Sequence, residues 1–283
     1  PERMRVVPPG TDLQRFFPPR GDEREQDIAR QVDRFFANPD KPIILALSRP
    51  DPRKNIISLI EAFCESPALQ EAANLLLITG NRSDIEEMEN APRSVLTGLL
   101  LAVDKYDLYG RVAYPKQHRP DEVAVLCRLA ALSRGVFINP ALTEPFGLTL
   151  LEAAASGLPV VATEDGGPRD IIANCRNGRL VNPLDKEAMA ATLLDMLADR
   201  QRWHRHAASG VRGVRAHYSW RAHVKHYLRV IRPLVDSRQP LHRPAVRRSP
   251  GVIRKRAIFA SLDLNLIGDQ ESLARLLQLM QRQ

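Results

Sequence analysis

The amino-acid sequence predicts an α/β fold: a Rossmann-like parallel sheet with helices on both faces. Short apolar runs, each the length of one buried strand, alternate with stretches whose apolar residues recur at helical spacing. Glycine, proline and small polar residues separate the two kinds of segment. This alternation is typical of a parallel sheet covered on both faces, in which ligands bind beyond the carboxyl ends of the strands.

The predicted strands are continuous apolar runs rather than alternating ones, as expected for strands buried on both faces. Residues 43–47 read Ile-Ile-Leu-Ala-Leu, and residues 75–78 read Leu-Leu-Leu-Ile before Thr79 and Gly80 end the run. The remaining predicted strands are residues 111–114, 135–138, 159–163 and 180–181.

The predicted helices fill the intervals between these strands and continue after the last one. They are residues 55–63, 93–106, 121–131, 148–156, 167–173, 185–198, 199–217 and 219–235. Gly157 follows the fourth of them at the position where glycine commonly closes a helix.

Composition divides the chain into four segments. Residues 1–24 are rich in proline and charge and are expected to form an inter-domain linker. Residues 25–235 hold the predicted Rossmann-like domain. Residues 236–256 combine three prolines with many basic residues and read as a second linker, and residues 257–283 resemble the opening strand and helix of another α/β domain.

Basic residues gather late in the sequence. Residues 201–256 contain fifteen Lys or Arg and a single acid, Asp236. Such a segment contacts nucleic acid in some proteins, but the interleaved pattern of aromatic residues and the recognition motifs of those domains are missing. Solvated helix faces, a basic linker, or a surface that meets an anionic substrate remain as explanations, and we expect no nucleic-acid partner.

Three cysteines, Cys64, Cys127 and Cys175, lie far apart and show no metal-ligand spacing. No apolar run approaches the ~20 residues of a membrane helix. We therefore expect a cytoplasmic protein without a metal site or a membrane partner.

The turn after residues 43–47 is rich in cations. Arg49, Arg53 and Lys54 fall within six residues, immediately before a predicted helix. Two cations beside a helix N-terminus suit a diphosphate. A solvated polar loop is the alternative for a basic turn considered alone.

The turn after residues 135–138 adds two carboxylates. Glu144 precedes Pro145, which favours an extended backbone, and Glu152 follows eight positions later in the next predicted helix. Phe146, Gly147 and Leu148 offer backbone N–H groups at the helix start, and Gly147 permits close approach of a ligand. Carboxylates accept hydrogen bonds from sugar hydroxyls, so this spacing favours a sugar site over two unrelated surface acids.

Two glutamates separated by seven residues in this setting resemble the signature of the large retaining glycosyltransferase family with the GT-B fold. The similarity is closer to the sucrose-phosphate synthase group and extends over roughly residues 6–235. It rests on residues 46–55, 80–88, 104–110, 112–118, 135–152, 157–163 and 166–170. The resemblance implies that residues 25–235 are the nucleotide-sugar-binding, C-terminal half of a GT-B enzyme.

The resemblance also implies roles for individual residues. Arg49 and Lys54 would hold the donor diphosphate and stabilise the departing UDP. Glu144 would bind the transferred hexose together with the backbone of Phe146, Gly147 and Leu148. Glu152 would accept hydrogen bonds from the ribose.

Two further turns belong to the same expected crevice. Gly80 and Asn81 would line it, together with Arg82. The turn that contains Tyr114 and Lys116 would contact the uracil.

The implied reaction transfers glucose from UDP-glucose to fructose 6-phosphate with retention, giving sucrose 6-phosphate and requiring no metal or other cofactor. A sucrose synthase, another retaining hexosyltransferase, and a non-catalytic nucleotide-sugar-binding fragment remain alternatives. In this family a first domain supplies most acceptor contacts, and it is not recognisable here. We therefore expect this chain alone to be inactive.

Residues 257–283 resemble the start of a haloacid-dehalogenase-type sucrose-phosphate phosphatase. That family places a nucleophilic Asp and an acidic residue two positions apart. Here Asp263 is followed by Asn265, and an amide cannot serve as the catalytic acid. We expect no phosphatase activity from this segment.

Overall fold

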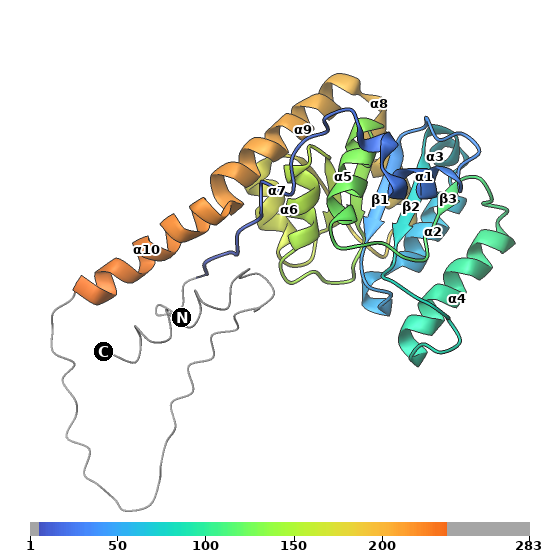
Figure 1. The fold of residues 1–283 in the computed structure, drawn as a ribbon, viewed down its shortest axis with the longest axis horizontal. Coiled ribbons are helices and arrows are strands. Elements are labelled where there is room, and N and C mark those ends of the chain that lie inside the picture. The colour runs from blue at the N-terminus through green and yellow to red at the C-terminus, as the bar shows by residue number, and fades with distance from the viewer. Residues whose placement is uncertain (1–5, 237–283) are drawn as a thin grey trace, which may run out of the picture. The chain divides into compact units, whose positions relative to one another are not determined.

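A computed structural model describes residues 6–236, which belong to one compact unit, Pro1–Asp236. The unit has a central sheet between two layers of helices, and its last helix continues beyond the sheet (Figure 1). The predicted α/β fold with a parallel sheet is confirmed. Most of the predicted linker 236–256 and the whole segment 257–283 lie outside the described residues, so the four-segment division stays a prediction.

The described residues form a six-stranded, wholly parallel sheet in the order β3-β2-β1-β4-β5-β6. The strands overlap the predicted runs. The side chains of β2 to β5, and all but the last of β1, are buried, as expected for strands covered on both faces, whereas Arg179 and Leu180 of β6 are exposed. Their bounds are β1 Ile43–Leu47, β2 Asn74–Ile78, β3 Val112–Ala113, β4 Val136–Asn139, β5 Val160–Thr163 and β6 Gly178–Val181.

The strand order reverses direction between β1 and β4. These strands pair through Ile44 with Val136 and Leu45 with Phe137, and the chain continues from them toward opposite edges of the sheet. The connections that leave β1 and β4 therefore diverge. Such a switch point opens a crevice at the carboxyl ends of the two strands, where ligands of doubly wound sheets bind.

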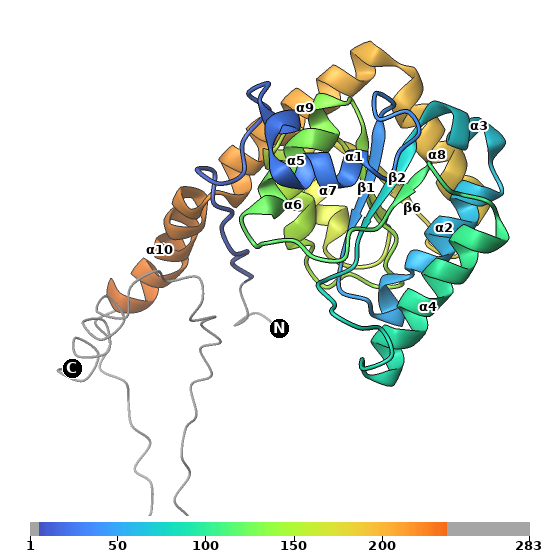
Figure 2. The same ribbon diagram turned by 45° about the vertical axis from the view of Figure 1, so that its right-hand side comes forward.

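Two apolar cores separate the sheet from its helices, one on each face. On one face the core contains residues of α1, α5, α6 and α7, and on the other residues of α2, α3, α4 and α8 (Figure 2). The helices are α1 Asp27–Asp33, α2 Ile56–Cys64, α3 Pro67–Ala72, α4 Asn90–Lys105, α5 Glu122–Leu132, α6 Leu148–Ala155, α7 Pro168–Cys175, α8 Lys186–Ala198, α9 Arg200–Gly213 and α10 Trp220–Asp236.

Helices α1 and α3 were not predicted. Both are short, and tertiary burial of a few residues, such as Ile28 and Val32 in α1 and Leu69 in α3, stabilises them more than any sequence periodicity. The predicted helix 199–217 is also interrupted, because α9 ends at Gly213 and a π-helical turn, Val214–Tyr218, follows.

The N-terminal segment is fixed against the start of α10. Thr11 donates its backbone N–H to the carbonyl of Tyr218 at 2.7 Å, and His223 donates from Nδ1 to the carbonyl of Pro8 at 2.7 Å. A Cβ atom at Gly10 would lie 2.6 Å from the Trp220 ring, so this contact requires glycine. The segment expected to be a linker is therefore packed from residue 8 to residue 11.

Candidate functional site

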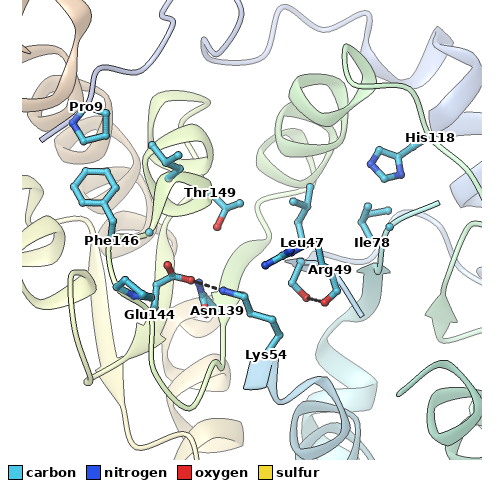
Figure 3. Close-up of a pocket in the computed structure, with 15 residues that line it drawn as sticks. Pro9, Leu47, Arg49, Lys54, Ile78, His118, Asn139, Glu144, Phe146 and Thr149 are labelled. Carbon is cyan, nitrogen blue, oxygen red and sulfur yellow. Dashed lines mark hydrogen bonds and ion pairs between the residues drawn. The ribbon is translucent and has the colours of Figure 1, made fainter. Parts of the chain in front are cut away.

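A pocket of about 740 Å³ lies at the switch point between β1 and β4 (Figure 3). The turn after β1 provides one wall, and the loop between β4 and α6 provides the other. The lining residues are Pro9, Leu47, Ser48, Arg49, Lys54, Ile78, Gly80, His118, Asn139, Glu144, Pro145, Phe146, Gly147, Leu148 and Thr149. Its volume is within the range of small-molecule sites.

Asp51 orders the basic turn after β1. Asp51 accepts from the backbone N–H of Arg53 at 2.9 Å and from the Arg53 guanidinium at 2.6 Å, which lowers the pKa of Asp51 to about 2. Lys54 follows, and Asn55 adopts a left-handed conformation with φ of 55° before α2 begins. Arg53 is thus neutralised by Asp51, whereas Arg49 and Lys54 line the pocket.

Glu144 receives two hydrogen bonds on the same carboxylate oxygen. Lys54 Nζ lies 2.8 Å and Asn139 Nδ2 lies 3.0 Å from Glu144 Oε2, as the dashed lines in Figure 3 show. Burial alone would raise the pKa of Glu144, but the hydrogen bonds from Lys54 and Asn139 outweigh burial and hold the pKa below its usual value. The group therefore stays ionised at neutral pH and keeps its acceptor capacity.

The loop that carries Glu144 is held by two glycines before α7. Glu144 donates its backbone N–H to Asp165 at 3.2 Å, and Gly167 donates to the carbonyl of Glu144 at 2.9 Å. Gly166 has a φ of +95°, and a Cβ atom there would overlap the Glu144 carbonyl. This close approach of the Gly166 and Glu144 backbones fixes the position of Glu144 in the pocket wall.

The backbone at the start of α6 faces the same pocket. Gly147 is the N-cap of α6 with a φ of +99°, and Phe146, Gly147, Leu148 and Thr149 are all lining residues. No side chain caps this helix start. The pocket thus combines two cations, one ionised carboxylate and a helix N-terminus, which together can bind a diphosphate and a polyol.

Asn81 makes two hydrogen bonds with the backbone of His118. Its Nδ2 donates to the carbonyl of His118 at 2.9 Å, and its Oδ1 accepts from the His118 N–H at 2.8 Å. The pair fixes the backbone of His118, whose side chain lines the pocket and whose pKa is lowered by burial. Asn81 itself is not a lining residue.

Tyr114 and Lys116, predicted to contact the base, do not line this pocket. The Tyr114 ring packs against Phe35 with centroids 5.0 Å apart, and Lys116 lines a separate hollow of about 410 Å³. Arg82 ties this turn to β2, because its guanidinium donates to the carbonyls of Tyr114 and Pro115.

Glu152 lies one turn into α6 and is also absent from the pocket lining. Burial raises its pKa to about 7, and the nearby Arg15 offsets the rise only in part. The exposure of the Glu152 side chain is intermediate between buried and exposed.

The structure brings most of the predicted residues together. Those that line the pocket are Arg49, Lys54, Gly80, Glu144, Phe146, Gly147 and Leu148, and those that do not are Asn81, Arg82, Tyr114, Lys116 and Glu152. Sequence reasoning missed Pro9, Asn139 and His118. Asn139 ends an apolar strand at the switch point and was recognisable, whereas Pro9 and His118 reach the pocket only through long-range contacts.

Within the described part of the chain, no helix combines the length and apolarity required to cross a bilayer.

Residues 27–210 match the family of glycosyl transferases, group 1. The probable sucrose-phosphate synthase 5 of Oryza sativa subsp. japonica is 47% identical over 271 residues, which cover 88% of this chain and 27% of that protein. A probable sucrose-phosphate synthase of Solanum tuberosum is 49% identical over 238 residues, 80% of this chain and 22% of that protein. The chain thus spans about a quarter of the length of these curated relatives.

Solved structures agree with this relationship. The sucrose-phosphate synthase of Thermosynechococcus elongatus has a TM-score of 0.66 and 32% identity, covering 82% of this chain and 52% of that one. Anabaena HepE in complex with UDP has a TM-score of 0.68 at 19% identity, covering 82% of this chain and 58% of that one, which is a likeness of fold. The match over residues 27–210 shows that this chain belongs to the group 1 glycosyl transferase family.

Proposed function

We propose that this chain binds UDP-glucose and provides the donor side of a retaining glucosyl transfer to fructose 6-phosphate, which yields sucrose 6-phosphate. Its relatives at 47% and 49% identity are probable sucrose-phosphate synthases, which supports this acceptor over others. A cytoplasmic location, the lack of a nucleic-acid partner and the lack of a metal or cofactor requirement are parts of the same proposal.

The observation that carries the proposal is the pairing of Lys54 with Glu144 across the pocket, at 2.8 Å. It places a cation suited to phosphate next to an acceptor suited to sugar hydroxyls, as a nucleoside-diphosphate sugar requires at the bond that joins its two parts. Lys54 has three donors, so it can bind a phosphate oxygen while it keeps its bond to Glu144.

In the proposed reaction the developing negative charge is on the departing UDP. Arg49 and Lys54 stabilise that charge electrostatically. Glu144 and the backbone at the start of α6 orient the glucosyl group, so that the acceptor hydroxyl attacks from a fixed direction. Glu152 accepts from the ribose when it is ionised, and Asn81 holds His118 at the pocket wall.

The remaining assignments rest on the family resemblance. Tyr114 and Lys116 are proposed to contact the uracil. Contacts to fructose 6-phosphate are assigned to a first domain, as in GT-B enzymes, and we expect this chain alone to bind donor without turnover. A sucrose synthase type of reaction and a purely nucleotide-sugar-binding role are the alternatives.

Calorimetric titration of the chain with UDP, UDP-glucose and a DNA duplex tests the proposal. We expect saturable binding of UDP and UDP-glucose and none of the duplex at physiological ionic strength. Assay of the chain with UDP-glucose and fructose 6-phosphate should give no sucrose 6-phosphate. Failure to bind either nucleotide would exclude the donor site, and measurable turnover would exclude the assignment of the acceptor contacts to another domain.

A further inference from the structure

A second hollow, of about 690 Å³, lies against α9 and has a strongly basic lining. We call it the arginine hollow; its charged lining includes Arg176, Arg179, Arg202, Arg205, His206 and Arg212. Nothing in the proposed glucosyl transfer uses these residues.

Helix α9 forms one wall of the arginine hollow, and the segment that joins α7 to β6 forms the other. Arg202, Arg205 and Arg212 are spaced at three and seven positions along α9 and share one face of that helix. Arg176 closes α7 in a left-handed conformation with φ of 50°, and Arg179 follows on the edge strand β6. His206 Nδ1 donates to the Arg176 carbonyl at 3.1 Å and joins the two walls.

The arginine hollow lies toward the amino ends of the strands, whereas the donor pocket lies at their carboxyl ends. Arg176 precedes β6, and Arg179 is its second residue, so both mark the amino end of a strand. On α9, Trp203 Nε1 donates to the carbonyl of Gly135, immediately before β4, at 2.7 Å. The donor pocket is built from the carboxyl ends of β1 and β4, so one anion cannot occupy both sites.

Carboxylates neutralise only part of this charge. Asp195 pairs with Arg202 at 2.7 Å and with Arg179 at 3.5 Å. Among the side chains described, those of residues 6–232, no carboxylate lies within 4.0 Å of the guanidinium groups of Arg176, Arg205 or Arg212. The buried Nε of Arg202 also has no acceptor in the described structure.

The α9 N-terminus does not account for the hollow, because Asp199 already caps it by accepting from the backbone N–H of Arg202 at 2.9 Å. Three like charges held around one concave surface repel one another, and a bound anion relieves that repulsion. Guanidinium groups bind tetrahedral oxyanions through paired N–H donors.

We propose that the arginine hollow binds a small phosphate-bearing anion, either inorganic phosphate or a phosphomonoester. The volume is within the range of small-ligand sites, and the cations surround a concavity. Double-stranded nucleic acid requires instead an extended row of cations that follows the phosphate backbone. This site does not depend on the proposed donor function.

The test compares two triple variants of the whole chain. Arg176→Gln, Arg205→Gln and Arg212→Gln remove the unpaired cations of the arginine hollow. Arg215→Gln, Arg221→Gln and Arg229→Gln remove the same charge from exposed positions outside its lining. Circular dichroism checks that both variants keep the wild-type fold.

Binding of inorganic phosphate, glycerol phosphate and a DNA duplex is measured by calorimetry in physiological chloride. We expect saturable binding of a phosphate probe to the wild type, a loss of at least about tenfold in the hollow variant, and little change in the control. Binding of glycerol phosphate alone identifies a phosphomonoester site, whereas binding of both probes identifies a phosphate site. Absence of binding in chloride, equal weakening in both variants, or preference for the duplex would overturn the proposal.

UDP affinity should be equal in the wild type and both variants, and this measurement tests the donor pocket separately.

Discussion

Lys54 Nζ and Glu144 Oε2 meet at 2.8 Å, although the two residues are 90 positions apart in the chain. The contact joins the turn after β1 to the loop after β4. It bridges the two walls of the crevice that the reversal of strand order opens. The charged groups proposed to hold the two halves of the donor are therefore one connected unit.

Replacing Glu144 with Gln should separate sugar recognition from nucleotide recognition. The variant loses a charged acceptor for hexose hydroxyls but leaves Lys54 free for phosphate. We expect UDP-glucose affinity to fall about tenfold while UDP affinity stays within about threefold of the wild type. Calorimetry with both ligands measures the difference, and Glu87→Gln, at an exposed position outside the pocket, is the control. An equal loss for UDP and UDP-glucose would contradict the role of Glu144.

Two arginines of one turn should differ in their effect on UDP. Arg49 lines the pocket, whereas Arg53 is outside the lining and is paired with Asp51 at 2.6 Å. Arg49→Gln should weaken UDP binding about tenfold or more, because it removes a charge-assisted hydrogen bond to the diphosphate. Arg53→Gln should change it little. If the two substitutions weaken UDP binding equally, general electrostatic attraction and not a defined contact holds the nucleotide.

Gly166 should be irreplaceable for two separable reasons. A Cβ atom there would overlap the Glu144 carbonyl, and the backbone has a φ of +95°. Gly21 has a similar φ of +103° but open space around it. Gly21→Ala should therefore cost only the backbone strain, about 1–2 kcal/mol, while Gly166→Ala should cost more and also reduce UDP-glucose affinity. Denaturant unfolding of both variants gives the free energies of unfolding, and equal losses would show that the contact with Glu144 is unimportant.

The raised pKa of Glu152 predicts a pH-dependent stability. Its pKa is about 7 in the folded chain against 4.5 as the ordinary value, with burial as the cause. The folded state therefore favours the protonated acid, so its stabilising effect is complete below about pH 4.5 and is lost as pH rises through 7. Relative to Glu152→Gln, the wild type should lose roughly 3 kcal/mol of unfolding free energy between about pH 4.5 and pH 8. Urea unfolding at both pH values measures this, and parallel pH profiles would contradict it.

The same ionisation should affect donor binding. If the Glu152 carboxylate accepts from the ribose, UDP-glucose affinity should rise as pH increases through about 7. The Glu152→Gln variant should lack this rise. A wild-type affinity that is independent of pH in this range would remove Glu152 from the donor site.

The fold was predictable because its strands are unusually uniform. Runs such as Ile43–Leu47 and residues 75–78 are apolar throughout, which distinguishes buried parallel strands from surface ones. Helices α1 and α3 escaped prediction because a few buried residues in a short segment carry no clear period. The interruption at Val214–Tyr218 depends on packing of Val214 and Tyr218 into the core, which the helical pattern does not reveal.

The pocket was predictable where local sequence determines it. Arg49, Lys54, Glu144 and Gly147 sit in turns directly after strands, and parallel topology brings those turns together. The surroundings of Glu152 and Asn81 depend on contacts with segments that are distant in the sequence. Arg15 lies close enough to Glu152 to influence its pKa, and the Asn81 amide is occupied by His118. Neither partner is adjacent in sequence, so spacing alone could not indicate these contacts.

Pro9 belongs to the pocket wall, yet its neighbour Pro8 is held by His223, 215 positions later in the chain. Such a contact closes a very long loop, which forms late during folding. The strands and the Lys54–Glu144 pair can assemble before it. The pocket wall at Pro9 is therefore complete only when α10 has docked. Ligand affinity then measures whether the two ends of the described chain have come together.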